Sequence, residues 1–235
     1  RLGSNMTVNR TWGNELNETS NGFRLPIRRT MLEFSPILPV RWPNGDFAQQ
    51  SDVKSLGLEG LGNPVQTAKQ HKNLRDRLQI FGSTYLEFNI LPNLEFRTQF
   101  GIDNVDTEQR EFAGKNLRSF FGFPDGHANL FNEEETFWQV ENFATYDNDI
   151  GPHSINVVGG ASWQQNDFND FSLNVEGFTS DFSGFNNVDA ASIINAPSSN
   201  EGKWTINSYW LRNNYTFDRR YNVTFTARVD GSSRF

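Results

Sequence analysis

Apolar and polar residues alternate with a period of two over a long stretch in the first half of the chain. Such a period places successive side chains on opposite faces of a β-strand, so the pattern predicts a long strand with one apolar face over residues 74–90. The alternation resumes over residues 94–106. Together the two segments predict a hairpin with a three-residue loop, 91–93, in which Ile90 pairs with Leu94.

The same alternation predicts further long strands along the chain. They cover residues 2–12, 136–146, 153–166, 203–217 and 221–230. The strand 136–146 is the weakest of them, because Asn142 interrupts its apolar face. The prediction is therefore an all-β fold, an antiparallel meander of about seven long strands in one open, curved sheet.

Short and long connections alternate along this meander. The short ones are 91–93, 147–152 and 218–220, and the long ones are 14–73, 113–134 and 170–202. This order places every short turn at one end of the sheet and every long connection at the other. Soluble sandwiches instead have strands of about 5–6 residues and loops of mixed length at both ends. The arrangement is typical of a segment of an outer-membrane β-barrel.

The pattern also predicts which residues face one another across the strands. The expected pairs are Glu87 with Arg97, Phe88 with Phe96, Tyr215 with Val223, and Arg212 with Thr226. On the apolar face, aromatic residues lie near the short turns, and Trp163 and Tyr209 follow further along their strands. About eight residues separate the two levels, a rise of roughly 20 Å, close to the spacing of aromatic girdles in a membrane barrel. We expect this face to remain bare, since the long connections are too polar to cover it.

The long connections contain local signals for helices and turns. Residues 24–40 predict a short helix followed by extended chain, and Asn63-Pro64 predicts the capped start of another helix. Turns are expected at residues 44–46 and 124–126. The glycine-rich segment 57–62 lacks the Lys-Ser/Thr of a phosphate-binding loop, so we expect a flexible extracellular loop there.

Composition and charge exclude several classes of protein. The chain has 235 residues, a net charge of −7 and no cysteine. An acidic chain is a poor partner for a phosphate backbone, so we expect no nucleic-acid binding. Without cysteine there is no disulfide scaffold, thiolate zinc site or thiol nucleophile. The sequence contains no apolar run long enough for a transmembrane helix.

No set of residues with catalytic chemistry emerges. His71, His127 and His153 are far apart in the sequence, outside any His-Glu-x-x-His motif, and are expected in loops or turns. There is no Gly-x-Ser-x-Gly motif for a hydrolase. Residues 147–151 begin like a calcium loop, but the glycine comes one place early and the twelfth position is Val158 instead of glutamate. We therefore expect no enzyme activity, no cofactor and no metal.

One long run of residues, 213–235, resembles the barrel of SusC/RagA-type TonB-dependent outer-membrane transporters. Its most specific part is the ending Arg228-Val229-Asp230-Gly231-Ser232-Ser233-Arg234-Phe235. Further segments that match this family, in the order expected, are Pro36-Ile37-Leu38-Pro39-Val40, Asn63-Pro64, Phe100-Gly101-Ile102-Asp103 and Phe178. The resemblance extends over essentially the whole chain.

The resemblance implies a large transmembrane β-barrel of about 22 strands, with an N-terminal plug, in the outer membrane of a Gram-negative cell. Members of the family import oligosaccharides or peptides with a SusD-like surface lipoprotein, driven through the TonB complex. Residues 1–235 would be a partial barrel domain in contact with outer-membrane lipid. We expect the plug, the TonB box and the signal peptide to belong to a longer parent protein.

A second class of function stays open at this point. The chain could be a soluble, secreted, non-enzymatic β-sandwich that binds glycans. The length of the strands and the one-sided long connections favour the transporter wall. No substrate-binding residue is assigned, because the loops that would contact a substrate are spread along the chain.

Overall fold

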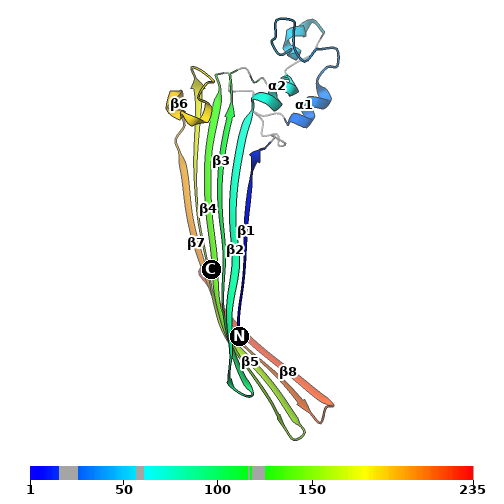
Figure 1. The fold of residues 1–235 in the computed structure, drawn as a ribbon, viewed down its shortest axis with the longest axis vertical. Coiled ribbons are helices and arrows are strands. Elements are labelled where there is room, and N and C mark those ends of the chain that lie inside the picture. Colours follow the sequence, from blue (N-terminus) through cyan, green and yellow to red (C-terminus); the bar gives the residue numbers. More distant parts are fainter. Residues whose placement is uncertain (16–25, 57–60, 116, 118–124, 235) are drawn as a thin grey trace.

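A computed structural model describes residues 1–15, 26–56, 61–115, 117 and 125–234. Within them, a single antiparallel sheet runs most of the length of the molecule (Figure 1). The strand order is β1-β2-β3-β4-β5-β7-β8, and the short strand β6 pairs with β5. Strands adjacent in the sheet thus follow one another along the chain, and β1 and β8 form its two edges. The predicted open meander is confirmed.

The strands are unusually long for a soluble protein, in which about 5–6 residues are typical. The longest, β5, has 26 residues. Their bounds are β1 (Leu2–Asn14), β2 (Lys72–Leu91), β3 (Leu94–Ala113), β4 (His127–Ile150), β5 (His153–Phe178), β6 (Ala191–Ile194), β7 (Ser198–Phe217) and β8 (Tyr221–Ser232). Figure 1 shows the short turns at its lower end and the long connections, with α1, α2 and β6, at its upper end. We call these the turn end and the loop end of the sheet.

Several strands continue further toward the loop end than the alternation predicts. They reach or begin at Ala113 in β3, His127 in β4, Phe178 in β5 and Ser198 in β7. The predicted connections 113–134 and 170–202 are therefore too long, and residues 114–126 and 179–197 join the strands instead. Polar residues such as Glu133-Glu134-Glu135 interrupt the apolar face there, and apolar residues return to it only at the loop end, as at Leu173 and Val175. Ladder hydrogen bonds to both neighbouring strands continue the sheet there without that pattern.

Two of the predicted short turns are tighter than expected. Leu91 pairs with Leu94 around Pro92-Asn93, and a register shift leaves Ile90 without the predicted partner. The next turn consists of Gly151-Pro152 alone. Gly151 has a φ of 59°, a left-handed conformation that glycine adopts without strain, which allows β4 to continue up to this turn.

The predicted register is confirmed in β2 and β3 away from the shift and in the hairpin of β7 and β8. Glu87 pairs with Arg97 and Phe88 with Phe96, while Tyr215 pairs with Val223 and Arg212 with Thr226. Residues 218–220 form the predicted three-residue loop, with Asp218 and Arg219 at positive φ. The register therefore places the alternating apolar positions of the strands on one side of the sheet, the apolar face, and the positions between them, which are mostly polar, on the other, the polar face.

The two predicted helices form at the loop end. Helix α1 (Ile27–Glu33) lies within the predicted segment 24–40, of which residues 24 and 25 are outside the described residues. Helix α2 (Pro64–Gln70) begins after Asn63, whose side chain accepts hydrogen bonds from the backbone N–H groups of Val65 and Gln66. The N-cap prediction is confirmed. Neither these helices nor any other in the described part of the chain is long and apolar enough to span a bilayer.

The remaining predictions for the connections concern turns and a glycine-rich loop. The turn at residues 44–46 is present, with Gly45 at a φ of 93° and the N–H of Trp42 bonded to the carbonyl of Asp46. Gly126 also has a positive φ, while Pro124 lies outside the described residues. The same holds for residues 57–60 of the predicted flexible loop. Three short 3₁₀ segments cover Gln50–Leu56, Gly184–Asn186 and Val188–Ala190.

A compact hydrophobic core covers the apolar face at the loop end. Its buried members are Phe112, Ala128, Val175, Phe178 and Phe185. Phe112 and Phe178 make an edge-to-face contact with ring centroids 5.3 Å apart. Phe185, Val188 and Ala190 come from the connection between β5 and β7. The expectation that this face stays bare is therefore wrong at the loop end, because one polar connection carries enough apolar residues to cover it.

Candidate functional surfaces

The apolar face is exposed over the half of the sheet nearest the turn end. Large aliphatic and aromatic side chains there keep between 44% and 73% of their surface accessible. They are Leu2, Met6 and Val8 of β1, Leu86 and Phe88 of β2, Phe100 of β3, Tyr209 and Leu211 of β7, and Val223, Phe225 and Val229 of β8. We call this surface the apolar band. Soluble monomers rarely expose contiguous apolar patches beyond a few hundred Å². An exposed apolar band of this extent is unfavourable in water, so we expect it to contact an apolar environment.

Aromatic pairs mark both margins of the apolar band. Near the turns, Phe88 and Phe96 have ring centroids 5.4 Å apart, and Phe217 and Tyr221 stack at 6.5 Å. Further along the strands, Trp163 and Tyr209 meet edge-to-face at 6.4 Å. Aromatic rings with a polar edge favour the border between hydrocarbon and water. The two levels therefore delimit the apolar band on both sides.

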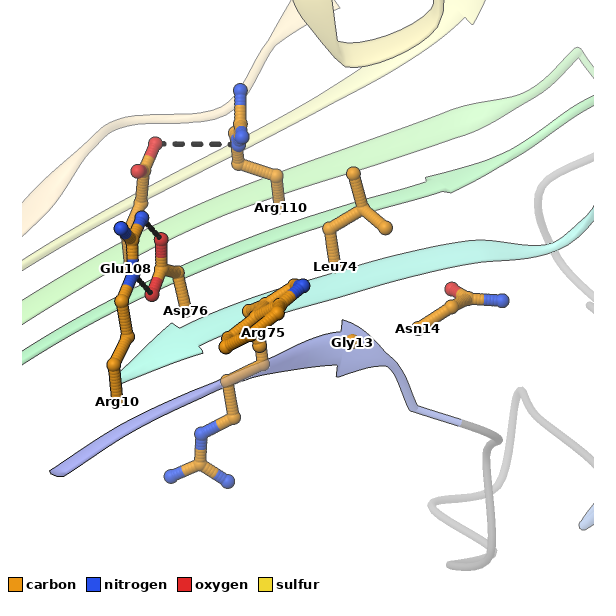
Figure 2. Close-up of a pocket in the computed structure, with 9 residues that line it drawn as sticks. Arg10, Gly13, Asn14, Leu74, Arg75, Asp76, Glu108 and Arg110 are labelled. Carbon is orange, nitrogen blue, oxygen red and sulfur yellow. Dashed lines mark hydrogen bonds and ion pairs between the residues drawn. The ribbon is translucent and has the colours of Figure 1, made fainter. Parts of the chain in front are cut away.

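Beyond the second level, the same face becomes charged. Arg10 of β1 makes two hydrogen bonds to Asp76 of β2, of 2.6 and 3.0 Å. Glu108 and Arg110 of β3 lie 3.2 Å apart. These residues line a cavity of about 370 Å³ beside Leu74 and Asn14 (Figure 2). The hydrogen bonds from Arg10 hold the pKa of the Asp76 carboxyl below its usual range. The charged zone is suited to water, in contrast to the apolar band.

The polar face opposite the apolar band carries charged groups beside aromatic rings. Arg97 lies 3.8 Å from Glu87, and its guanidinium stacks 4.0 Å above the Tyr85 ring. In the same row of the register, Trp210 lies over Gly160, where an added Cβ would come within 2.5 Å of the indole. A strand surface with ion pairs on this side and hydrocarbon on the other matches a wall between water and lipid.

The histidines do not converge on one site. His71, which ends α2, is buried, and its Nε2 lies 2.9 Å from the Glu111 carboxylate of β3. His127 is also buried, as the first residue of β4. His153 follows the Gly151-Pro152 turn and hydrogen-bonds the Tyr215 hydroxyl. The expectation of loop or turn positions fits His71, which lies between α2 and β2, whereas His127 and His153 are the first residues of strands. His71 and His127 are both packed inside the loop end.

The sequence provided no signal for this burial, because a histidine between a helix and a strand has no characteristic spacing. The His71–Glu111 contact joins α2 to the sheet across 40 residues of chain. No group of three or more potential metal ligands assembles within the part of the chain that the structure describes. The contact links the C-terminal end of α2 to β3 of the sheet.

Known proteins are similar to this chain in sequence and in fold. No family model matches the sequence. TonB-dependent receptor P3 of Formosa agariphila is 27% identical over 202 residues, which are 86% of this chain and 20% of the relative. TonB-dependent receptor P26 of the same organism is 28% identical over 176 residues, 74% of this chain and 18% of the relative. The chain is a homologue of TonB-dependent receptors.

Solved structures place the sheet within a barrel. A structure of the RagAB peptide importer in the open-open state matches all of this chain with a TM-score of 0.72 and 18% identity, over 26% of the solved chain. A structure of the RagAB peptide transporter matches 82% of this chain with a TM-score of 0.68 and 20% identity. The open sheet thus has the fold of part of a RagA barrel.

The similarity confirms the predicted resemblance to TonB-dependent outer-membrane transporters. TonB-dependent receptors are non-enzymatic β-barrels of the outer membrane, in agreement with the expected location and the expected lack of enzyme activity. The chain spans about a fifth of the length of the curated relatives that it matches.

Proposed function

We propose that residues 1–235 form part of the barrel domain of a TonB-dependent outer-membrane importer. The observation that carries this proposal is the exposed apolar band, bounded by aromatic pairs and backed by a polar face. In this arrangement the apolar band contacts lipid and the polar face lines the barrel interior, the lumen. The charged zone and the loop-end core then project above the membrane into the extracellular medium.

We propose the cargo and the partners of the parent protein by analogy with its relatives. The fold neighbours are structures of a peptide importer, RagAB, which favours peptides over oligosaccharides as the imported substrate. The SusC/RagA resemblance adds a SusD-like lipoprotein that contacts the extracellular connections. It also adds the TonB complex, which would act through parts of the parent outside residues 1–235.

The soluble glycan-binding alternative lacks structural support. A β-sandwich buries its apolar faces between two packed sheets. The strands of the described residues belong to one sheet, and its apolar band has no second sheet against it.

Uptake by cells that carry the full-length receptor tests the proposal. We expect deletion of the receptor gene to abolish energy-dependent uptake of labelled peptides from a protein digest, and deletion of tonB to have the same effect. Loss of oligosaccharide uptake instead would change the substrate and leave the transporter assignment in place. Unchanged uptake of both substrate classes would contradict the proposed function.

A further inference from the structure

Three aromatic residues form a patch on the polar face in the loop-end half of the sheet. They are Phe137 of β4, Phe168 of β5 and Trp204 of β7, and we call them the aromatic patch. Phe137 and Trp204 have ring centroids 6.0 Å apart. Both pair with Asn166 of β5, which is 5% exposed. The three rings are half-buried, on the face whose other side chains are mostly polar.

Phe168 leans over the neighbouring strand. It pairs with Gly202 of β7, and a Cβ added at this glycine would collide with one edge of the Phe168 ring. The absence of a side chain at Gly202 therefore leaves room for the ring. The ring is half-buried, so part of it stays accessible to a ligand.

Carboxylates surround this ring. Glu135 of β4 pairs directly with Phe168, and one step along the ladder Glu133 pairs with Asp170. Within the described residues, no ion pair reaches any of these three carboxylates. Like charges on directly opposed strand positions destabilise a sheet. A cation bound here would relieve that repulsion.

The chain itself provides an example of a cation on this patch. The guanidinium of Arg234 lies 4.4 Å from the centroid of the Trp204 ring. A guanidinium above an indole face is attracted by the negative charge density of the ring. The patch therefore combines two features that favour the same ligand group, aromatic rings and carboxylates that form no ion pair among the described residues, although Asp170 accepts a hydrogen bond from Asn200.

We propose that the aromatic patch binds an arginine or lysine side chain of a peptide in the lumen. The cationic group stacks on Phe168 and pairs with Glu135, with Glu133 and Asp170 adding to the attraction. This inference rests on the proposed function, because it takes the polar face as the wall of the import path. It adds that the receptor selects for positive charge on the imported peptide.

Binding by the purified full-length receptor tests the inference. The probes are two short fluorescein-labelled Gly/Ser peptides, one with arginine and the other with citrulline, the uncharged analogue, at the same positions. Fluorescence anisotropy should give a lower Kd for the arginine peptide. Glu135→Gln and Phe168→Leu should each weaken its binding by about three- to tenfold.

Glu134→Gln is the matched control, because Glu134 is the next residue but lies on the apolar face, in the charged zone. It should leave the Kd unchanged. Equal affinity for the two peptides, or equal effects of Glu134→Gln and Glu135→Gln, would overturn the inference. A lowered melting temperature of Phe168→Leu together with an unchanged Kd would also overturn the inference. That result would mean that the Phe168 ring packs against another part of the receptor instead of contacting the peptide. TonB-dependent uptake of uncharged peptides would preserve the proposed function in each of these cases.

Discussion

The turn-end and loop-end halves of the sheet share the same strands and the same register, yet they are built for different surroundings. At the turn end the apolar face is exposed and has aromatic pairs at its margins. At the loop end the same face is covered by a hydrophobic core from the connection between β5 and β7. A charged zone that contains Arg10 and Asp76 separates the two (Figure 2). Along a single strand, the apolar face thus passes from a lipid-like to an aqueous setting and then to a protein interior.

This comparison indicates that an apolar side chain on a barrel strand has two different uses. In the apolar band such a side chain needs no protein partner, because it contacts lipid. In the loop-end core it needs a tightly packed partner, because water surrounds that part of the sheet. Substitutions should therefore follow different rules in the two halves.

The largest effect is expected in the loop-end core. Phe178→Ala removes a ring that is 1% exposed and packs edge-to-face on Phe112. The cavity should lower the stability of the loop end by about 3–5 kcal/mol. Hydrogen exchange of the full-length receptor should show lost protection in β6 and the end of β5. Phe182→Ala, in the same connection but 95% exposed, should leave exchange unchanged. Equal effects of the two substitutions would mean that the core does not stabilise this end.

A charge in the apolar band should have the next largest effect. Phe225→Arg places a guanidinium on the face assigned to lipid, midway between the aromatic levels at Tyr221 and Tyr209, and should cost about 2–4 kcal/mol. Thr224→Arg, one residue before it, faces the lumen and should be nearly neutral. Heat-modifiable migration of the parent receptor on gels reports the folded fraction of each variant. Equal tolerance at the two positions would contradict the assignment of the faces.

A smaller effect is expected at the cap of α2. Asn63 caps this helix, and its amide also donates to the carbonyls of Val40 and Ala48. Asn63→Ala should cost about 1–2 kcal/mol locally. Limited proteolysis should then cleave between α1 and α2 faster than in the wild type. Asn44→Ala, in the exposed turn of the same connection, is the control. A similar rate for both variants would show that the cap does not hold this connection in place.

The smallest effect concerns pH in the charged zone. Since hydrogen bonds from Arg10 lower the pKa of Asp76 in the folded protein, this pair stabilises the fold above the ordinary carboxyl pKa. The contribution should be lost as the pH falls through the lowered value. Both groups are exposed, so the change is small and weakens further with salt. Melting curves of the wild type and of Asp76→Asn should converge in acid, and a constant difference would contradict the prediction.

Much of the fold could be predicted from the alternation because one face of each strand avoids water. Wherever that holds, the period of two determines the strand, its faces and its register, as at Phe88–Phe96 and Tyr215–Val223. The Asn63-Pro64 cap is equally local, since a side chain and two N–H groups within three residues form it. Tight turns were less predictable, because the Gly151-Pro152 turn depends on where the ladder between β4 and β5 ends.

Only the tertiary structure decided two kinds of feature. The first is the part of each strand where both faces contact water, and the second is the set of contacts between segments far apart in the sequence. Charged stretches of β4 and β5, such as Glu133-Glu134-Glu135, interrupt the alternation, and hydrogen bonds to the neighbouring strands continue the sheet across them. The loop-end core and the His71–Glu111 contact join residues tens of positions apart, without any spacing that marks them. The aromatic patch likewise comes from three strands and becomes one surface only once the register is set. The sequence by itself determined the strands and their two faces, because these depend on local periodicity, and the tertiary structure decided which groups meet on them.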